Sequence, residues 1–83
     1  MTKSRAMDIR ATVGLNVLRI RRERNLSQEE LSFRSGLTRA YLSGLEAGRR
    51  NPTIVSLSKL ADALSVDLEL LVRSNKRSDA EAK

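Results

Sequence analysis

The sequence predicts an all-α fold in which five short helices pack around one core. No segment alternates apolar and polar residues in the manner of a strand, whereas apolar residues recur at spacings of three and four. Signals for helix starts and stops also recur along the chain. At 83 residues the chain buries only about two-thirds of its unfolded surface, which suits a single compact core.

The first helix is expected over residues 11–24, because Val13, Val17 and Ile20 follow a helical spacing. Residues 1–10 show no clear period. We therefore expect them to form a basic N-terminal arm that is mobile or frayed.

The strongest helix start lies at Ser27, which is followed three positions later by Glu30 in the pattern of a capping box. Leu26 and Leu31 flank this start as a hydrophobic staple. Gly36 can adopt the left-handed conformation that ends a helix. The sequence therefore predicts a short second helix between Ser27 and Gly36.

A third helix follows at once. Thr38 can cap it, and Leu37 with Leu42 forms a second staple. Gly48 closes this helix, and residues 49–52 form a loop because a proline biases the residue before it away from the helical region.

Two further helices complete the fold. Thr53 caps a fourth helix, and Asp67 caps a short fifth helix with a staple from Val66 to Leu71. The buried stripe of the fourth helix consists of Ile54, Leu57, Leu60, Ala61 and Leu64. The expected domains are therefore the arm at 1–10, one helical domain at 11–73 and a polar, disordered tail at 74–83.

Composition excludes several classes of function. The chain has no cysteine and no histidine, so disulfides, thiolate chemistry, the commonest zinc ligands and the commonest general base are missing. An enzyme is therefore the weakest hypothesis, and no cofactor is expected. The longest apolar run, residues 70–72, is far shorter than the roughly 20 residues of a membrane span. We expect a cytoplasmic protein of bacterial or phage origin without a membrane contact.

The net charge of +6 is unevenly distributed. Basic residues outnumber acidic ones by seven to two in residues 1–25 and by four to one in residues 34–51. In residues 52–72 the acidic residues are in excess by three to one. This pattern suits a polyanion on one side of the domain, although scattered solvated charges would produce the same counts.

Residues 28–47 form the most informative unit: a short helix, a tight turn and a second short helix. Leu31, Leu37, Leu42 and Leu45 can fix the angle between the two helices. This is the pattern of a helix-turn-helix, whose second helix presents its N-terminal residues to the major groove of DNA.

From residue 13 to residue 71 the chain is similar to the lambda-repressor-like, Cro-type (XRE) helix-turn-helix family. Within the family, residues 37–51 and the short chain resemble the controller proteins of restriction–modification systems. The residues that carry the family resemblance are Val13-Gly14, Val17, Ile20-Arg21, Leu26-Ser27-Gln28-Glu29-Glu30-Leu31, Ser35-Gly36-Leu37, Tyr41-Leu42-Ser43, Leu45-Glu46, Gly48, Arg50-Asn51-Pro52-Thr53, Leu57, Leu60-Ala61, Ala63-Leu64, Val66, Leu68 and Leu71.

The resemblance implies a role for individual residues. Arg39, Ala40 and Ser43 fall on positions that face base edges, and an arginine can pair with both O6 and N7 of guanine. Arg21 and Glu46 correspond to an ion pair between the first and third helices. The expected phosphate contacts, which position the protein without specifying sequence, are Gln28, Thr38, Tyr41, Arg49, Arg50 and Asn51. The alternative for these arginines is a solvated surface charge.

Some positions depart from the family pattern. Gly44 lies inside the recognition helix, where it leaves room for either DNA or the second helix. Leu15, Leu18 and Phe33 stand at positions that the family commonly makes polar, and isolated exposed apolar residues need no special cause.

The last two helices carry more apolar residues than one core can bury. The surplus predicts a homodimer interface formed by Val55, Leu68, Leu70 and Val72. Such a dimer would set two recognition helices about 34 Å apart, which fits a near-palindromic site.

The sequence thus predicts a homodimeric, sequence-specific regulator of transcription that binds double-stranded DNA without a small-molecule effector. Two alternatives remain. The same fold can serve as a protein-interaction module, such as an antitoxin or a coactivator adaptor. A basic domain can also bind nucleic acid through charge alone, without preference for sequence.

Overall fold

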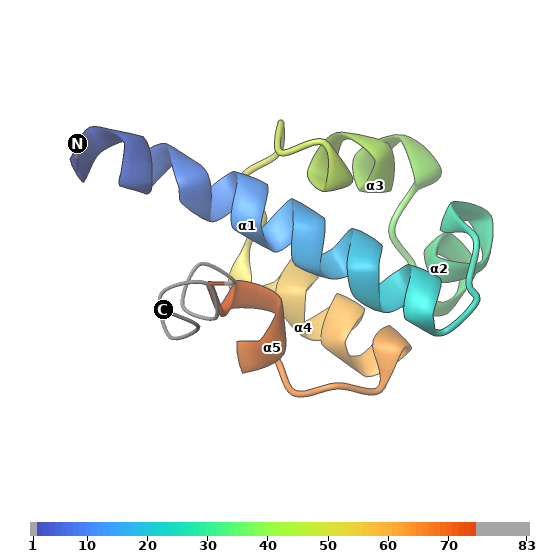
Figure 1. The fold of residues 1–83 in the computed structure, drawn as a ribbon. Coiled ribbons are helices and arrows are strands. Elements are labelled where there is room, and N and C mark those ends of the chain that lie inside the picture. Colours follow the sequence, from blue (N-terminus) through green and yellow to red (C-terminus); the bar gives the residue numbers. More distant parts are fainter. Residues whose placement is uncertain (1, 75–83) are drawn as a thin grey trace.

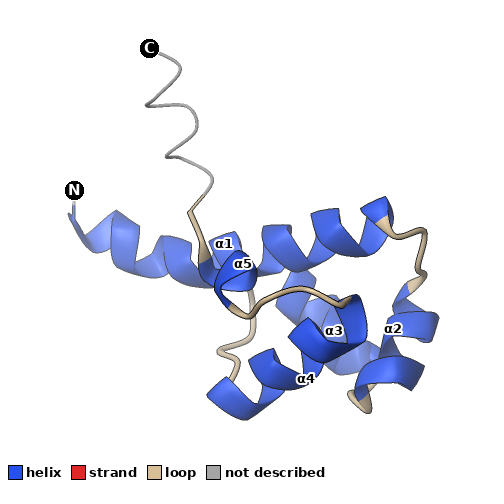
Figure 2. Cartoon of the chain, turned by 90° about the horizontal axis from the view of Figure 1, so that it is seen from below, coloured by secondary structure: helices blue, strands red, loops and turns tan. Residues whose placement is uncertain are grey.

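The computed structural model describes residues 2–74, with side chains described from residue 9 onward. This part of the chain contains no strand and consists of the helices α1 (Thr2–Glu23), α2 (Gln28–Ser35), α3 (Arg39–Glu46), α4 (Ile54–Leu64) and α5 (Glu69–Val72). The predicted all-α fold of five helices is therefore confirmed. Helix α1 crosses the molecule with α3 on one side and α4 and α5 on the other, and α2 packs against α3 and α4 (Figures 1 and 2).

Helix α1 is longer than the sequence indicated. It begins at Thr2, so the expected start at residue 11 is wrong. Residues 2–10 contain no proline or glycine, and adding turns to an existing helix needs no new nucleation. The N-terminal part of α1 extends beyond the other helices in Figure 1. Side chains of residues 1–8, and the predicted tail from residue 75 onward, lie outside the described residues.

The predicted helix starts at Ser27, Thr38 and Thr53 are all confirmed. Ser27 forms a complete capping box: its Oγ accepts from the amide of Glu30 at 3.0 Å, and its own amide donates to Glu30 Oε1 at 3.0 Å. Thr38 and Thr53 each accept a hydrogen bond from the backbone amide three residues later. Gly36 adopts the left-handed conformation at the end of α2.

The predicted start of α5 is wrong. Leu68, not Asp67, is the N-cap residue, and no side chain caps this single turn. The backbone closes the start instead, because the carbonyls of Asp67 and Leu68 accept from the amides of Leu70 and Leu71 at 3.0 and 2.9 Å.

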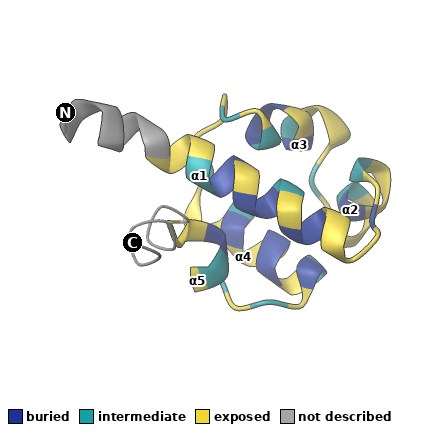
Figure 3. Ribbon diagram, in the orientation of Figure 1, coloured by how far each residue is buried: buried dark blue, intermediate teal, exposed yellow. Residues whose placement is uncertain are grey.

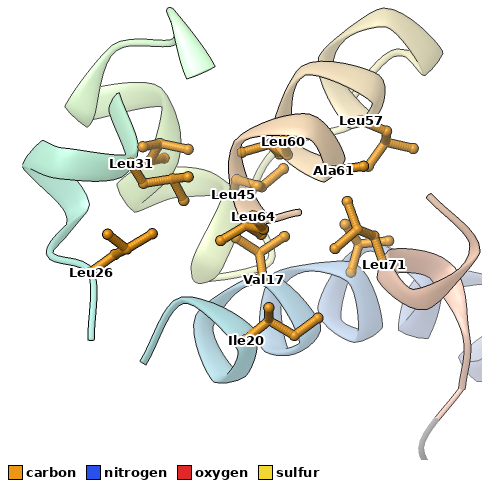
Figure 4. Close-up of a cluster of buried hydrophobic side chains, with 12 residues drawn as sticks. Val17, Ile20, Leu26, Leu31, Leu45, Leu57, Leu60, Ala61, Leu64 and Leu71 are labelled. Carbon is orange, nitrogen blue, oxygen red and sulfur yellow. The ribbon is translucent and has the colours of Figure 1, made fainter. Parts of the chain in front are cut away.

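The core contains the apolar stripe expected for α4, with one exception (Figures 3 and 4). Ile54 is 71% exposed, so its placement in the core is wrong. It is the first residue of α4, one turn before the helix reaches the core at Leu57. The buried apolar residues are Val13, Val17, Ile20, Leu26, Leu31, Leu42, Leu45, Leu57, Leu60, Ala61, Leu64 and Leu71.

A buried asparagine joins the two ends of the domain. Asn16 is fully buried, and its amide nitrogen donates to the carbonyls of Leu71 at 3.0 Å and Arg73 at 2.9 Å. Arg19 donates to the Asn16 side-chain oxygen at 3.2 Å. Because a buried amide needs such partners, Asn16 fixes the C-terminal end of α5 against α1. Sequence reasoning did not identify this residue.

Some apolar side chains remain exposed outside the core. Phe33 on α2 is almost fully exposed and Leu15 on α1 is about half exposed, whereas Leu18 is partly buried. None of the helices in residues 2–74 combines the length and the apolar character needed to cross a bilayer.

Candidate nucleic-acid interface

Helices α2 and α3 form the predicted helix-turn-helix. Leu31 and Leu42 are fully buried where the two helices pack. Two hydrogen bonds fix the turn between them: the Ser32 hydroxyl donates to the carbonyl of Leu37, and the amide of Leu37 donates to Ser35 Oγ at 3.2 Å. Ser32 therefore helps to fix the turn through its hydroxyl group.

The inner face of α3 is held closely against α1. A Cβ at Gly14 would lie 2.3 Å from the carbonyl oxygen of Leu45, so glycine permits this approach of the two helices. Arg21 and Glu46 form a salt bridge with two hydrogen bonds, from Nε to Oε2 at 2.7 Å and from Nη2 to Oε1 at 3.0 Å. Both side chains are nearly buried, and paired, bidentate geometry is what makes a buried charge tolerable.

Glu46 also connects α2 to this ion pair. The amide nitrogen of Gln28, the first residue of α2, donates to Glu46 Oε1 at 2.8 Å. Arg21 Nη1 donates to the carbonyl of Leu26, just before α2, at 2.8 Å. Three helices therefore meet at one carboxylate, which fixes the orientation of α3. Gln28 lies at the start of α2 as expected, and its contact with phosphate stays a prediction.

The outer face of α3 is open. Arg39, Ala40 and Ser43 are all exposed and lie within the first five residues of the helix. Exposed surface is visible along α3 in Figure 3. The Arg39 side chain does not point into the core, which leaves it accessible to a ligand. Thr38 is exposed at the N-terminus of α3, where its Oγ accepts from the amide of Tyr41 at 3.1 Å. The side chains predicted to read bases therefore share one accessible surface.

The loop after α3 carries exposed basic residues and turns back against the helix. Gly48 has φ of +79°, and its amide donates to the carbonyl of Leu45 at 3.0 Å. The amide of Arg49 donates to the carbonyl of Gly44 at 2.8 Å. This pair of bonds is a Schellman motif, which reverses the chain direction after a helix. Arg49, Arg50 and Asn51 are exposed in the reversed segment.

The sequence left room beside Gly44 for either DNA or the second helix, but the side chain that lies there is that of Arg50. A Cβ at Gly44 would lie 3.0 Å from Nε and 3.1 Å from Cγ of Arg50. The Arg50 guanidinium continues from there to a position 5.4 Å from the centre of the Tyr41 ring. Tyr41 is partly buried on the core side. No sequence signal indicated this contact, because it depends on the reversal at Gly48.

The residues predicted for the dimer interface differ in exposure. Val55 is 61% exposed and Val72 is 36% exposed, whereas Leu68 and Leu70 are partly buried and pack against the core. Ile54, which the sequence analysis had assigned to the core, adds exposed apolar surface beside Val55. Helix α4 thus begins with two exposed apolar side chains.

A short helix, a fixed turn and a second short helix with an open polar face define a helix-turn-helix DNA-binding domain. A family model for helix-turn-helix domains (HTH_3) matches residues 17–71, and the chain belongs to this XRE-type family. The family consists of DNA-binding regulators of transcription and not of enzymes. The resemblance drawn from the sequence is therefore confirmed.

Individual relatives support the same assignment. An uncharacterized HTH-type transcriptional regulator, y4dJ of Sinorhizobium fredii, is 57% identical over 60 residues, which cover 72% of this chain and 78% of that protein. The crystal structure of the restriction–modification controller protein C.AhdI from Aeromonas hydrophila is similar with a TM-score of 0.73 and 40% identity, covering 75% of this chain and 94% of that chain.

A second similar structure contains DNA. It is the restriction–modification controller protein C.Esp1396I, as a tetramer in complex with its natural 35-base-pair operator. Its TM-score is 0.70 at 35% identity, and the match covers 77% of this chain and 90% of that chain.

Proposed function

We propose that the protein is a homodimeric regulator of transcription that reads a near-palindromic operator in double-stranded DNA. One observation carries this proposal: the outer face of α3, with Arg39, Ala40 and Ser43, is open to solvent while its inner face is fixed to α1 and α2. A helix held in this way can enter the major groove without losing its support. The operator complex of C.Esp1396I supports the same mode of action for this chain.

Base recognition is assigned to Arg39, Ala40 and Ser43. Arg39 can donate to O6 and N7 of one guanine, a contact worth roughly 1–3 kcal/mol of discrimination. Ala40 can contact a thymine methyl group, and Ser43 can donate or accept. Arg39 therefore carries most of the sequence preference in this proposal.

Phosphate contacts flank this surface on both sides. They orient α3 in the groove and supply affinity that depends on salt. The residues assigned to this role are Gln28, Thr38, Tyr41, Arg49, Arg50 and Asn51. The basic segment at 1–10 lies outside this set, and we assign no function to the tail at 74–83.

The homodimer is proposed to form through α4 and α5. Val55 and Val72 provide exposed apolar surface, Leu68 and Leu70 line its edge, and Ile54 extends it. A two-fold axis through this surface would place the two copies of α3 about one turn of DNA apart. No cofactor and no small-molecule effector is needed for this mode of binding. As a regulator of bacterial or phage DNA it would act in the cytoplasm.

Selection of duplexes from a random library, followed by footprinting, tests the DNA-binding part of the proposal. We expect two related half-sites about 10 base pairs apart and a selected site bound at least about 10³-fold more tightly than random duplexes. Equal affinity for all sequences would favour a non-specific binder instead. Absence of any affinity for DNA would favour a protein-interaction module.

Sedimentation of the Val55→Asp variant tests the proposed interface. A buried charge on the two-fold axis opposes association, so we expect a monomer. Phe33→Asp is the matched control, because Phe33 is also an exposed apolar residue but lies on α2. Dissociation by Phe33→Asp but not by Val55→Asp would place the interface elsewhere.

A further inference from the structure

The side chain of Arg50 does not extend freely from its loop. Its aliphatic stem lies against the backbone of Gly44, where an added Cβ would come within 3.1 Å of Cγ and 3.0 Å of Nε. Its guanidinium lies 5.4 Å from the centre of the Tyr41 ring, within the range of a cation–π interaction. We call Tyr41 and Gly44 together the Arg50 platform.

The Arg50 platform is a single surface of α3. Its two residues are three positions apart, so they lie one above the other on the same helix face. Arg50 runs along this face from Gly44 back toward Tyr41, in the direction of the N-terminal half of α3. A charge from the loop is thus held against α3, the helix that also carries Arg39 and Ser43.

The loop backbone is restrained as well. The bonds from Gly48 to Leu45 and from Arg49 to Gly44 fix the two residues that precede Arg50. In the described part of the chain the salt bridges are Arg19–Glu23, Arg21–Glu46 and Glu69–Arg73, so no carboxylate neutralises Arg50. Its charge is held in place but not cancelled.

We propose that the Arg50 platform positions Arg50 in advance for a phosphate of the bound DNA, and that Gly44 is a positioning residue for this contact. The inference rests on the proposed DNA-binding function and deepens it. Immobilising a long side chain on binding costs affinity, so a side chain that is already restrained loses less. Glycine inside a helix is less stable than alanine, and the need to seat Arg50 explains its presence here.

Gly44→Ala separates this role from a structural one. The added methyl group requires the Arg50 side chain, and not a backbone atom, to move by a few tenths of an ångström. We expect a higher thermal midpoint, because alanine favours the helix, together with a roughly 2- to 10-fold loss of affinity for the selected duplex. The salt dependence of binding should stay the same, because Arg50 still reaches its phosphate.

The Arg50→Ala background is the decisive control. Arg50→Ala should weaken binding to selected and random duplexes alike and lower the salt slope by about 1. Adding Gly44→Ala to it should cause no further loss of affinity. If Gly44→Ala weakens binding equally in both backgrounds, the glycine serves the approach of DNA itself and the proposal is wrong.

Two variants of Tyr41 test the other half of the platform. Tyr41→Phe keeps the ring and should retain the coupling between Gly44→Ala and Arg50→Ala, whereas Tyr41→Leu should abolish it. Equal losses of affinity in both variants would assign the effect to the phenolic hydroxyl and overturn the role of the ring.

A measurement on the free protein distinguishes a failure of this inference from a failure of the proposed function. In the free protein, the NMR shift of Arg50 Nε–H should carry a ring-current contribution that Tyr41→Leu removes and Gly44→Ala changes. A wild-type chain that shows this shift but binds neither duplex would overturn the DNA contact and the proposed function together. A wild-type chain that binds DNA without this shift would overturn the platform alone.

Discussion

The two faces of α3 differ in what surrounds them. The inner face carries Leu42 and Leu45, both buried, and ends at Glu46 in the ion pair with Arg21. The outer face carries Arg39 and its exposed neighbours. One helix of eight residues therefore separates two tasks, because Leu42, Leu45 and Glu46, which anchor it, are not the residues that we assign to base recognition. Changes on the inner face should lower stability, and changes on the outer face should lower binding.

Glu46→Ala should have the largest effect on the inner face. It leaves Arg21 buried without its carboxylate and removes the acceptor for Gln28. Breaking a buried pair in this way costs about 3–5 kcal/mol of unfolding free energy. Urea denaturation measures the loss. The control is Glu29→Ala, which removes an exposed carboxylate from α2. A loss below about 1 kcal/mol for Glu46→Ala would mean that the pair behaves as a surface contact.

Asn16→Ala should have the next largest effect, because α1 is the support on which the inner face of α3 rests. The carbonyls of Leu71 and Arg73 lose their donor, at a cost of about 1–3 kcal/mol. Thermal or urea unfolding provides the measurement. Asn51→Ala, in the exposed loop, is the matched control and should change stability by less than about 0.5 kcal/mol. Equal effects of the two variants would contradict the buried role of Asn16.

Ser27→Ala should have the smallest effect of the three. It removes the hydroxyl that caps α2, the helix that supports the turn into α3. Loss of such a cap typically costs about 1 kcal/mol. Ser58→Ala, at an exposed position inside α4, is the comparison and should be nearly neutral. If Ser58→Ala is the more destabilising of the two, the capping box contributes little to the fold.

The sequence predicted the parts of the fold that depend on neighbouring residues. The capping box at Ser27 and the glycine at Gly36 act within a few residues of the chain, so the bounds of α2 could be read directly. The left-handed conformations of Asn25, which follows α1, and Ser65, which follows α4, were not signalled, because neither residue is glycine. The surrounding structure, and not the local sequence, holds them in that conformation.

Features that join distant segments could not be predicted from composition or spacing. The burial of Asn16 depends on carbonyls 55 and 57 residues further along the chain. The contact of Arg50 with Gly44 depends on the chain reversal at Gly48. The ion pair of Arg21 with Glu46 is the exception among long-range contacts. The family resemblance implied this pair, whereas composition and spacing did not.

The Arg39→Ala variant tests the outer face most directly. The measurement is the ratio of affinities for the selected duplex and a random duplex at one salt concentration, with unfolding free energy recorded in parallel. We predict a ratio of at least about 10³ for the wild type, a loss of roughly 1–3 kcal/mol of discrimination confined to one base position in the variant, and unchanged stability. A variant that keeps the full ratio, or that loses stability instead, would contradict the separation of tasks on α3.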